Sequence, residues 1–143
     1  MDVILKLVKN IITIDGPSGV GKGTLAFSLA ERLDWNVLDS GLLYRLVGYL
    51  SLKDGLETTR EIVQFLKKSK IKLITNLNES ICEIELKDKI LGKELRNENI
   101  ASRASELAKE AEIRNAIIEI QRNAYDAKKG PIADGRDMGT IIF

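Results

Sequence analysis

Residues 11–24 read IITIDGPSGVGKGT, and this stretch decides how the rest of the chain is interpreted. It opens with a β-branched run that ends at Asp15, which is typical of a short buried strand. A glycine-rich loop follows, and the amphipathic run LAFSLAERL comes directly after it. Strand, glycine loop and helix in this order form the context in which a phosphate-binding loop is expected.

The loop contains the residue types that phosphate binding needs. Its glycines allow positive φ and bring successive backbone N–H groups close to an anion, and the helix beginning near Lys22 adds the positive end of its dipole. Lys22 supplies a mobile positive charge for the β- and γ-phosphates, and Thr24 a hydroxyl suited to Mg²⁺. We therefore expect a nucleoside triphosphate here. The residues expected to contact it are Gly16, Pro17, Ser18, Gly19, Val20, Gly21, Lys22, Gly23 and Thr24.

Two other interpretations of the loop stay open. The pattern G-x-x-x-x-G-K-[ST] is met through Lys22, but a glycine then precedes the hydroxyl of Thr24, and a glycine-rich turn with a solvated lysine has the same residues. The dinucleotide fingerprint G-x-G-x-x-G is met at its first two glycines and has Thr24 in place of the third. Asp39 lies at about the right distance to be the ribose-binding acid of such a fingerprint.

Composition excludes several classes of function. The chain has 143 residues, 44% hydrophobic and 30% charged, which suits one soluble globular domain over residues 1–143. Its 22 basic and 21 acidic residues leave a net charge of +1, so we expect neither a nucleic-acid nor a membrane partner. The absence of histidine excludes Ser–His and Cys–His catalysis, and the single Cys82 excludes an internal disulfide framework. The N-terminal MDVILKLVKN fits neither a signal peptide nor a spanning helix, so we expect a cytoplasmic protein.

Two polar clusters stand at the ends of further predicted strands. Residues 36–38 lead into Asp39 and Ser40, and the helical spacing that begins at Leu42 places Tyr44 and Arg45 on the first turns of a helix. Parallel βαβ units carry their ligand-binding residues at such strand ends.

Residues 131–133 form the third predicted strand, which leads into Asp134, Gly135, Arg136 and Asp137. An acid in this place beside a phosphate loop is where nucleoside triphosphate enzymes hold Mg²⁺; an Asp-Gly turn with surface charges is the alternative.

The middle of the chain has a different character. Residues 58–61 have the pattern of a capping box that opens a helix, and residues 71–91 are predicted to form a small antiparallel β insert. Residues 99–128 are strongly helical, with Gly130 and Pro131 predicted to end the helix. Ser105 and Arg114 lie on this helical stretch as polar residues to which periodicity assigns no function.

Three motifs together resemble the bacterial cytidylate kinases, members of the P-loop nucleoside monophosphate kinase superfamily. They are GPSGVGKGT at residues 16–24, DSGLLYR at 39–45 and IADGRDMGT at 132–140. The loop variant is shared with adenylate kinases, whereas the other two motifs are far more specific. The resemblance covers the chain from end to end, including the small insert and the positions around Ser105 and Arg114.

The resemblance implies a fold, a reaction and a set of site residues. The fold is an α/β P-loop NTPase fold of three layers, with a parallel sheet, a helical acceptor-binding region and the small β insert. The reaction is phosphorylation of CMP or dCMP by ATP with Mg²⁺, a step of pyrimidine nucleotide metabolism, with Lys22 and Arg136 as catalytic residues. Thr24 and Asp134 would hold the metal. The residues implied for CMP binding are Ser40, Tyr44, Arg45, Ser105, Arg114, Arg136 and Asp137.

The sequence departs from the family where it ends, at Ile141, Ile142 and Phe143. Family members continue with further strands, an arginine-rich lid and the segment that holds the adenine. We therefore expect an incomplete, monomeric kinase domain of poor or no activity, whose first strand has an unpaired edge. A non-catalytic nucleotide-binding remnant is the alternative from another class, and a nicotinamide-binding domain is a more distant one.

Overall fold

The structure is a computed structural model, and it describes residues 3–8, 10–17, 21–124, 126 and 128–135. The chain divides into two compact units. The first comprises Met1–Ser40, Ile74–Cys82 and Gln121–Phe143, and the second comprises Gly41–Leu73 and Glu83–Ile120. The single domain over residues 1–143 stays a prediction.

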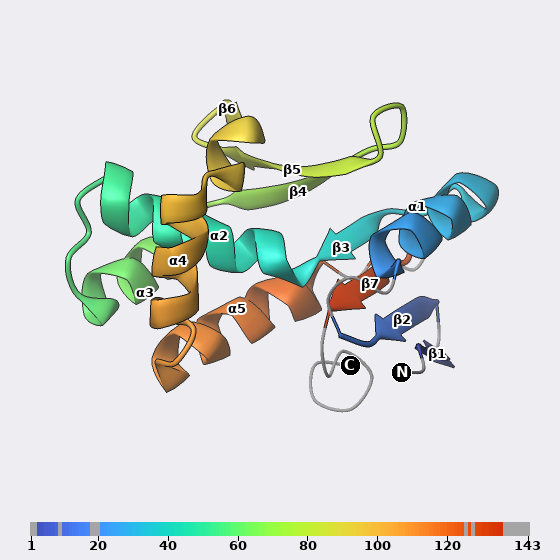
Figure 1. The fold of residues 1–143 in the computed structure, drawn as a ribbon, viewed down its shortest axis with the longest axis horizontal. Coiled ribbons are helices and arrows are strands. Elements are labelled where there is room, and N and C mark those ends of the chain that lie inside the picture. Colours follow the sequence, from blue (N-terminus) through green and yellow to red (C-terminus); the bar gives the residue numbers. More distant parts are fainter. Residues whose placement is uncertain (1–2, 9, 18–20, 125, 127, 136–143) are drawn as a thin grey trace. The chain divides into compact units, whose positions relative to one another are not determined.

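The first unit is built on a four-stranded sheet of order β1-β2-β7-β3 (Figure 1). Strand β7 pairs in parallel with both β2 and β3, and β1 is antiparallel to β2. The strands predicted at residues 11–15, 36–38 and 131–133 are confirmed to within two residues at each end. The bounds of the four strands are Ile4–Val8 for β1, Ile11–Asp15 for β2, Val37–Asp39 for β3 and Ile132–Gly135 for β7.

Strand β1 was not predicted, and it corrects the expectation that β2 has an unpaired edge. Ile4 lies opposite Asp15 and Val8 opposite Ile11, so β1 covers the whole length of β2. The two strands are separated by two residues, the commonest length for a hairpin connection. A partner so close in sequence satisfies the edge N–H and C=O groups of β2 at little cost in loop entropy.

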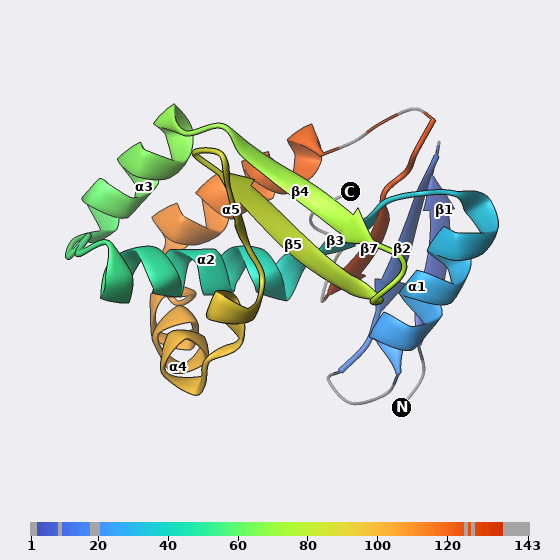
Figure 2. The same cartoon turned by 90° about the horizontal axis from the view of Figure 1, so that it is seen from above.

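Helix α1 (Lys22–Leu33) packs against this sheet (Figure 2). Ala26 and Ala30 are fully buried, and their small side chains, one turn apart, allow a close approach to the strands. The helix begins after Gly21, whose φ of +86° lies in the left-handed region, and Leu25 N–H donates to Gly21 O at 3.1 Å. The predicted order of strand, loop and helix is therefore confirmed.

The outer edge of β3 is satisfied by side chains. Thr75 Oγ1 accepts the N–H of Val37 at 2.9 Å, and the buried Cys82 Sγ donates to Val37 O at 3.6 Å. These contacts replace the hydrogen bonds that a further strand would make. Cys82 is therefore a buried residue with a weak polar contact in addition.

The second unit is helical apart from parts of a small sheet, of which residues 74–82 belong to the first unit. Helix α2 (Ser40–Lys53) begins with the last residue of the first unit and continues in the second. Helix α5 (Ala111–Asn123) lies in the second unit up to Ile120, and its last turn belongs to the first unit. Gly48 lets α2 approach α4 (Glu98–Leu107) closely, since a Cβ at this position would lie 2.5 Å from Ile100 O. Fully buried apolar side chains form the core: Leu46, Leu50, Ile62, Ile84, Leu95, Ile113 and Ile117.

Two local predictions in this part of the chain are confirmed. Thr58 caps α3 (Thr59–Lys68), with its hydroxyl accepting Glu61 N–H at 3.1 Å. The insert at residues 71–91 forms a sheet of order β4-β5-β6, in which β5 and β6 are antiparallel and residues 82, 84 and 86 are the buried ones. The bounds are Ile71–Asn76 for β4, Ile81–Leu86 for β5 and Lys89–Leu91 for β6, after which the short 3₁₀ helix η1 spans Lys93–Arg96.

The helical stretch predicted over residues 99–128 is two helices. Helix α4 ends at Leu107, and α5 ends at Asn123, before the predicted stop at Gly130. Beyond this earlier end, the carboxylate of Asp126 accepts the N–H groups of Lys128 and Lys129 at 2.7 and 3.2 Å, so these residues form a turn. Such side-chain bonds offer the backbone an alternative to the helix.

These elements confirm the α/β class of the P-loop nucleotide-binding fold, with a parallel sheet, helices and a small antiparallel insert. Within the described ranges, the chain contains no helix with the length and apolarity needed to cross a bilayer.

Candidate functional site

The parallel strands bring acidic residues together at their carboxyl ends. Asp134 on β7 is in register with Asp39 on β3 on one side and with Ile14 on β2 on the other. The prediction that the ends of the three strands meet is therefore confirmed. Two carboxylates from distant parts of the chain lie on neighbouring strands, next to the start of the phosphate loop.

Lys22 connects the first turn of α1 to the end of β7. Its Nζ donates to Gly135 O at 3.2 Å and lies 3.8 Å from Asp134 Oδ1. The two side chains are only 12% and 18% exposed, so this is a partly buried ion pair between residues far apart in sequence. A solvated surface lysine, the alternative from sequence, is therefore excluded for Lys22.

The electrostatics of Asp134 show that Lys22 does not neutralise the strand ends completely. Burial raises the pKa of the Asp134 carboxyl, and the negative charge of Asp39 raises it further. The charge of Lys22 and its hydrogen bond lower this pKa, and the net effect is still a rise. An additional cation at these strand ends would therefore stabilise the ionised carboxylates.

The described part of the loop fits a bound phosphate. Among the described residues, a Cβ added at Gly21 would meet nothing within 4 Å, and one at Gly23 would lie 3.8 Å from Asp134 Oδ2. The first turn of α1, which also carries the exposed Thr24, thus lies next to the carboxylate. Gly16 and Pro17 follow β2 as predicted. The remaining predicted residues here lie outside the described ranges: Ser18, Gly19, Val20, Arg136 and Asp137.

The donor atoms at the strand ends fit Mg²⁺ held jointly with a nucleotide. No group of three or more His, Cys, Asp or Glu side chains with metal-site spacing occurs in the described ranges. Mg²⁺ is usually bound by one or two carboxylates together with substrate phosphates, and it prefers oxygen ligands. Asp134, with Asp39 beside it and the hydroxyl of Thr24 on the adjoining turn, offers such oxygens.

Ser40 is the first residue of α2 and follows Asp39 directly, so it lies at the same strand ends. Its Oγ accepts a hydrogen bond from Gln121 Nε2 at 2.9 Å. Gln121 is 1% exposed and was not predicted as a site residue. The available signal was its spacing, because it falls four residues after Ile117 and eight after Ile113 on the apolar stripe of α5.

In the second unit, Tyr44 and Arg114 are close enough to interact electrostatically. Burial raises the pKa of the Tyr44 hydroxyl, and the positive charge of Arg114 opposes this rise. The Arg114 guanidinium also donates to Ala108 O at 3.0 Å and to Lys109 O at 2.7 Å, just beyond the end of α4. Two of the residues implied for CMP binding are therefore brought together here.

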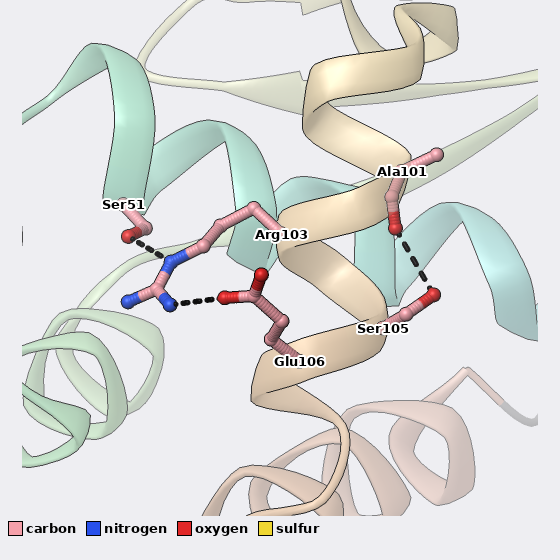
Figure 3. Close-up of polar contacts among 5 residues, drawn as sticks. All are labelled: Ser51, Ala101, Arg103, Ser105 and Glu106. Atoms are coloured by element: carbon pink, nitrogen blue, oxygen red, sulfur yellow. Dashed lines mark hydrogen bonds and ion pairs between the residues drawn. The ribbon is translucent and has the colours of Figure 1, made fainter.

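Two further residues implied for CMP binding lie in this unit, Arg45 and Ser105, and each donates a hydrogen bond to a backbone carbonyl. Arg45 Nη1 donates to Leu95 O at 3.3 Å, and the exposed Ser105 Oγ donates to Ala101 O at 3.1 Å. Figure 3 shows Ser105 on the opposite side of α4 from Arg103.

Arg103 was not singled out from the sequence. Its guanidinium donates to Ser51 Oγ of α2 at 3.0 Å and to Glu106 Oε2 at 2.8 Å. A side chain that joins two helices in this way has a structural role, and the face of α4 that bears Ser105 stays open to solvent.

Comparison with known proteins agrees with these motifs. The family model described as cytidylate kinase matches residues 12–143. The cytidylate kinase of Pseudomonas fluorescens strain Pf0-1 is 42% identical over 137 residues, 93% of this chain and 58% of the relative. Those of Azotobacter vinelandii and Pseudomonas syringae pv. tomato are 39% and 40% identical, over 93% and 97% of this chain and 58% and 61% of each relative. The chain thus spans about three fifths of the length of the curated relatives it matches.

Proposed function

The chain belongs to the cytidylate kinase family, and on that basis we propose that the protein transfers the γ-phosphoryl group of ATP to CMP or dCMP. The products are ADP and CDP or dCDP. The observation that carries the proposal is the placement of Lys22, between the glycine loop and the carboxylate of Asp134 at the end of β7. This placement is suited to a nucleoside triphosphate with a metal ion.

The donor nucleotide would bind at the phosphate loop. Backbone N–H groups of residues 16–24 would surround its phosphates, and Lys22 would exchange its bond with Gly135 O for the β- and γ-phosphates. Thr24 and Asp134 would hold Mg²⁺, which supplies positive charge against the developing negative charge of the phosphates.

The acceptor nucleotide would be bound by the residues that the family motifs assign. Arginine side chains suit bidentate contact with a phosphate, so Arg136 and Arg45 would face the monophosphate. Ser105, Arg114 and Asp137 offer donors and acceptors that match the edge of cytosine. Ser40 and Tyr44 would line the same acceptor nucleotide.

The proposed reaction is a direct transfer. A phosphate oxygen of CMP forms a new bond to the γ-phosphorus, the bond from that phosphorus to the bridging oxygen breaks, and its electron pair leaves with ADP. Catalysis consists of positioning and charge neutralisation without a covalent enzyme intermediate. The location expected from the sequence, the cytoplasm, and the monomeric state belong to the same proposal.

The test measures binding and turnover separately. The unmodified chain should bind both MgATP and CMP in calorimetric titrations, and CDP formation should be followed by chromatography with this chain and with a full-length form. Lys22→Ala should reduce turnover of the active form roughly a thousandfold, because it removes charge stabilisation of the transferred group. Arg136→Ala should chiefly weaken the binding of CMP.

Controls separate charge loss in general from loss at the site. Lys72→Ala and Arg32→Ala remove the same charges from exposed positions on β4 and α1 and should leave both ligands bound as before. Unchanged turnover in both Lys22→Ala and Arg136→Ala would contradict the mechanism. Binding of both nucleotides without any CDP would favour a non-catalytic nucleotide-binding role, and NADH binding that survives Lys22→Ala would favour a dinucleotide site.

A further inference from the structure

Gln121 is a polar residue at a core position. It occupies the last turn of α5 on the same stripe as Ile113 and Ile117, and only 1% of it is exposed. A buried amide destabilises the fold unless its polar atoms form hydrogen bonds. Nε2 bonds to Ser40 Oγ, whereas Oε1 has no hydrogen-bond partner in the described structure. Packing alone would favour an apolar side chain here, so the contact with Ser40 requires an explanation.

The direction of this hydrogen bond determines what Ser40 can do. A hydroxyl has one proton to donate and two lone pairs to accept with. Gln121 donates to Oγ and thereby occupies one lone pair, so the proton of Ser40 points away from Gln121 and stays available. The bond also holds Oγ in place at the start of α2, directly after Asp39.

We propose that Gln121 is a positioning residue for the acceptor nucleotide, holding Ser40 so that its hydroxyl donates to an oxygen of CMP. This inference rests on the proposed function, in which Ser40 contacts CMP. Gln121 itself acts through Ser40.

The test is a double-mutant cycle read by binding. Gln121→Met keeps the volume of the side chain and removes both polar atoms, and Ser40→Ala removes the hydroxyl. Each change should weaken CMP binding by roughly tenfold in calorimetric titrations, the size expected for one hydrogen bond to a charged group. The double variant should bind CMP no more weakly than Ser40→Ala alone, and ATP binding should be unchanged in all three.

A matched control is Gln64→Met, the same replacement at an exposed position of α3, which should bind CMP as the unmodified chain does. The proposal would be overturned if Gln121→Met weakened CMP binding equally in the unmodified chain and in Ser40→Ala. That result would show that Gln121 acts independently of Ser40. A fall in thermal stability with unchanged CMP affinity would overturn it as well.

A second measurement covers the case in which Gln121→Met does not fold. In a ¹⁵N-labelled chain, CMP should shift the side-chain amide resonance of Gln121, and Ser40→Ala should abolish this shift. The same shift in both proteins would overturn the proposal. Failure of the proposed function is distinguishable, because the unmodified chain would then show no CMP binding or Ser40→Ala would bind CMP normally.

Discussion

Lys22 and Gln121 of the first unit are held by distant residues, whereas Ser105 and Arg114 of the second unit are held by nearby ones. In the first unit, Lys22 contacts Gly135 O across 113 positions of sequence and also the neighbouring Asp134, and Gln121 contacts Ser40 across 81. In the second unit, Ser105 bonds to a carbonyl four residues before it, and Arg114 to carbonyls five and six residues before it.

This difference bears on how each substrate would bind. A parallel sheet places its strand ends together whether or not a ligand is present, so the donor residues are already assembled. In the proposed complex, Ser105 and Arg114 would exchange local backbone carbonyls for the base, whereas Lys22 would exchange Gly135 O for phosphates and stay beside Asp134. The donor nucleotide should therefore find a more ordered set of contacts than the acceptor.

The largest loss of stability is expected from Gly48→Ala, which acts in the second unit. The new Cβ would lie 2.5 Å from Ile100 O, a backbone atom that cannot move aside without displacing α4. We expect a loss of about 3 kcal/mol in the free energy of unfolding, measured in urea and assigned to the second unit by hydrogen exchange. Gly55→Ala adds the same methyl group in open space at a φ of +69° and should cost about 1 kcal/mol. If Gly48→Ala and Gly55→Ala lost the same free energy of unfolding, close packing between α2 and α4 would not be the cause.

A smaller effect, in the first unit, is expected from Asp134→Asn. The folded pKa of Asp134 lies above its ordinary value of 3.8, so the folded state binds more protons than the unfolded one between these two values. Its contribution to stability is therefore complete below pH 3.8 and is lost as the pH rises through the folded pKa. Without ligands and with EDTA, the asparagine variant should melt roughly 2–5 °C higher at pH 7, a difference that shrinks towards pH 4.

Asp54→Asn is the control for this pH dependence, because it makes the same change at an exposed position of the second unit. It should leave the melting temperature unchanged at both pH values. An Asp134→Asn protein that melts lower than the unmodified chain at pH 7 would show that the contact with Lys22 outweighs burial and the charge of Asp39.

The smallest effect on stability is expected from Ser105→Ala. Its hydroxyl bonds only within its own helix in the described structure and is exposed, so the free energy of unfolding should change by less than about 0.5 kcal/mol. CMP binding should nevertheless weaken by roughly tenfold, since the base would lose one hydrogen bond. Ser102→Ala, on an exposed position of the same helix, should change neither quantity. CMP affinity that is equal in the two variants would remove Ser105 from the acceptor site.

Local patterns were sufficient for most elements but not for the pairings between them. The capping box at Thr58 and the β insert at residues 71–91 depend on residues close in sequence, and both predictions are confirmed. Strand β1 was missed because its five residues, with one lysine among apolar ones, show no clear alternation, and its pairing with β2 is not visible in the sequence. The end of α5 was placed too late because Gly130 and Pro131 are the first strong stop signal after it in the sequence.

The sequence by itself determined the chemistry available to this protein: a glycine loop with Lys22, acidic strand ends, and two motifs characteristic of one kinase family. Each of these motifs is a short contiguous stretch, so it can be recognised from its own residues and their immediate neighbours in sequence. Only the tertiary structure decided which groups meet. Strand order put Asp134 between Ile14 and Asp39, burial then raised its pKa, and the packing of α5 brought a buried amide to Ser40. Such contacts depend on register and helix packing, which a single sequence does not specify.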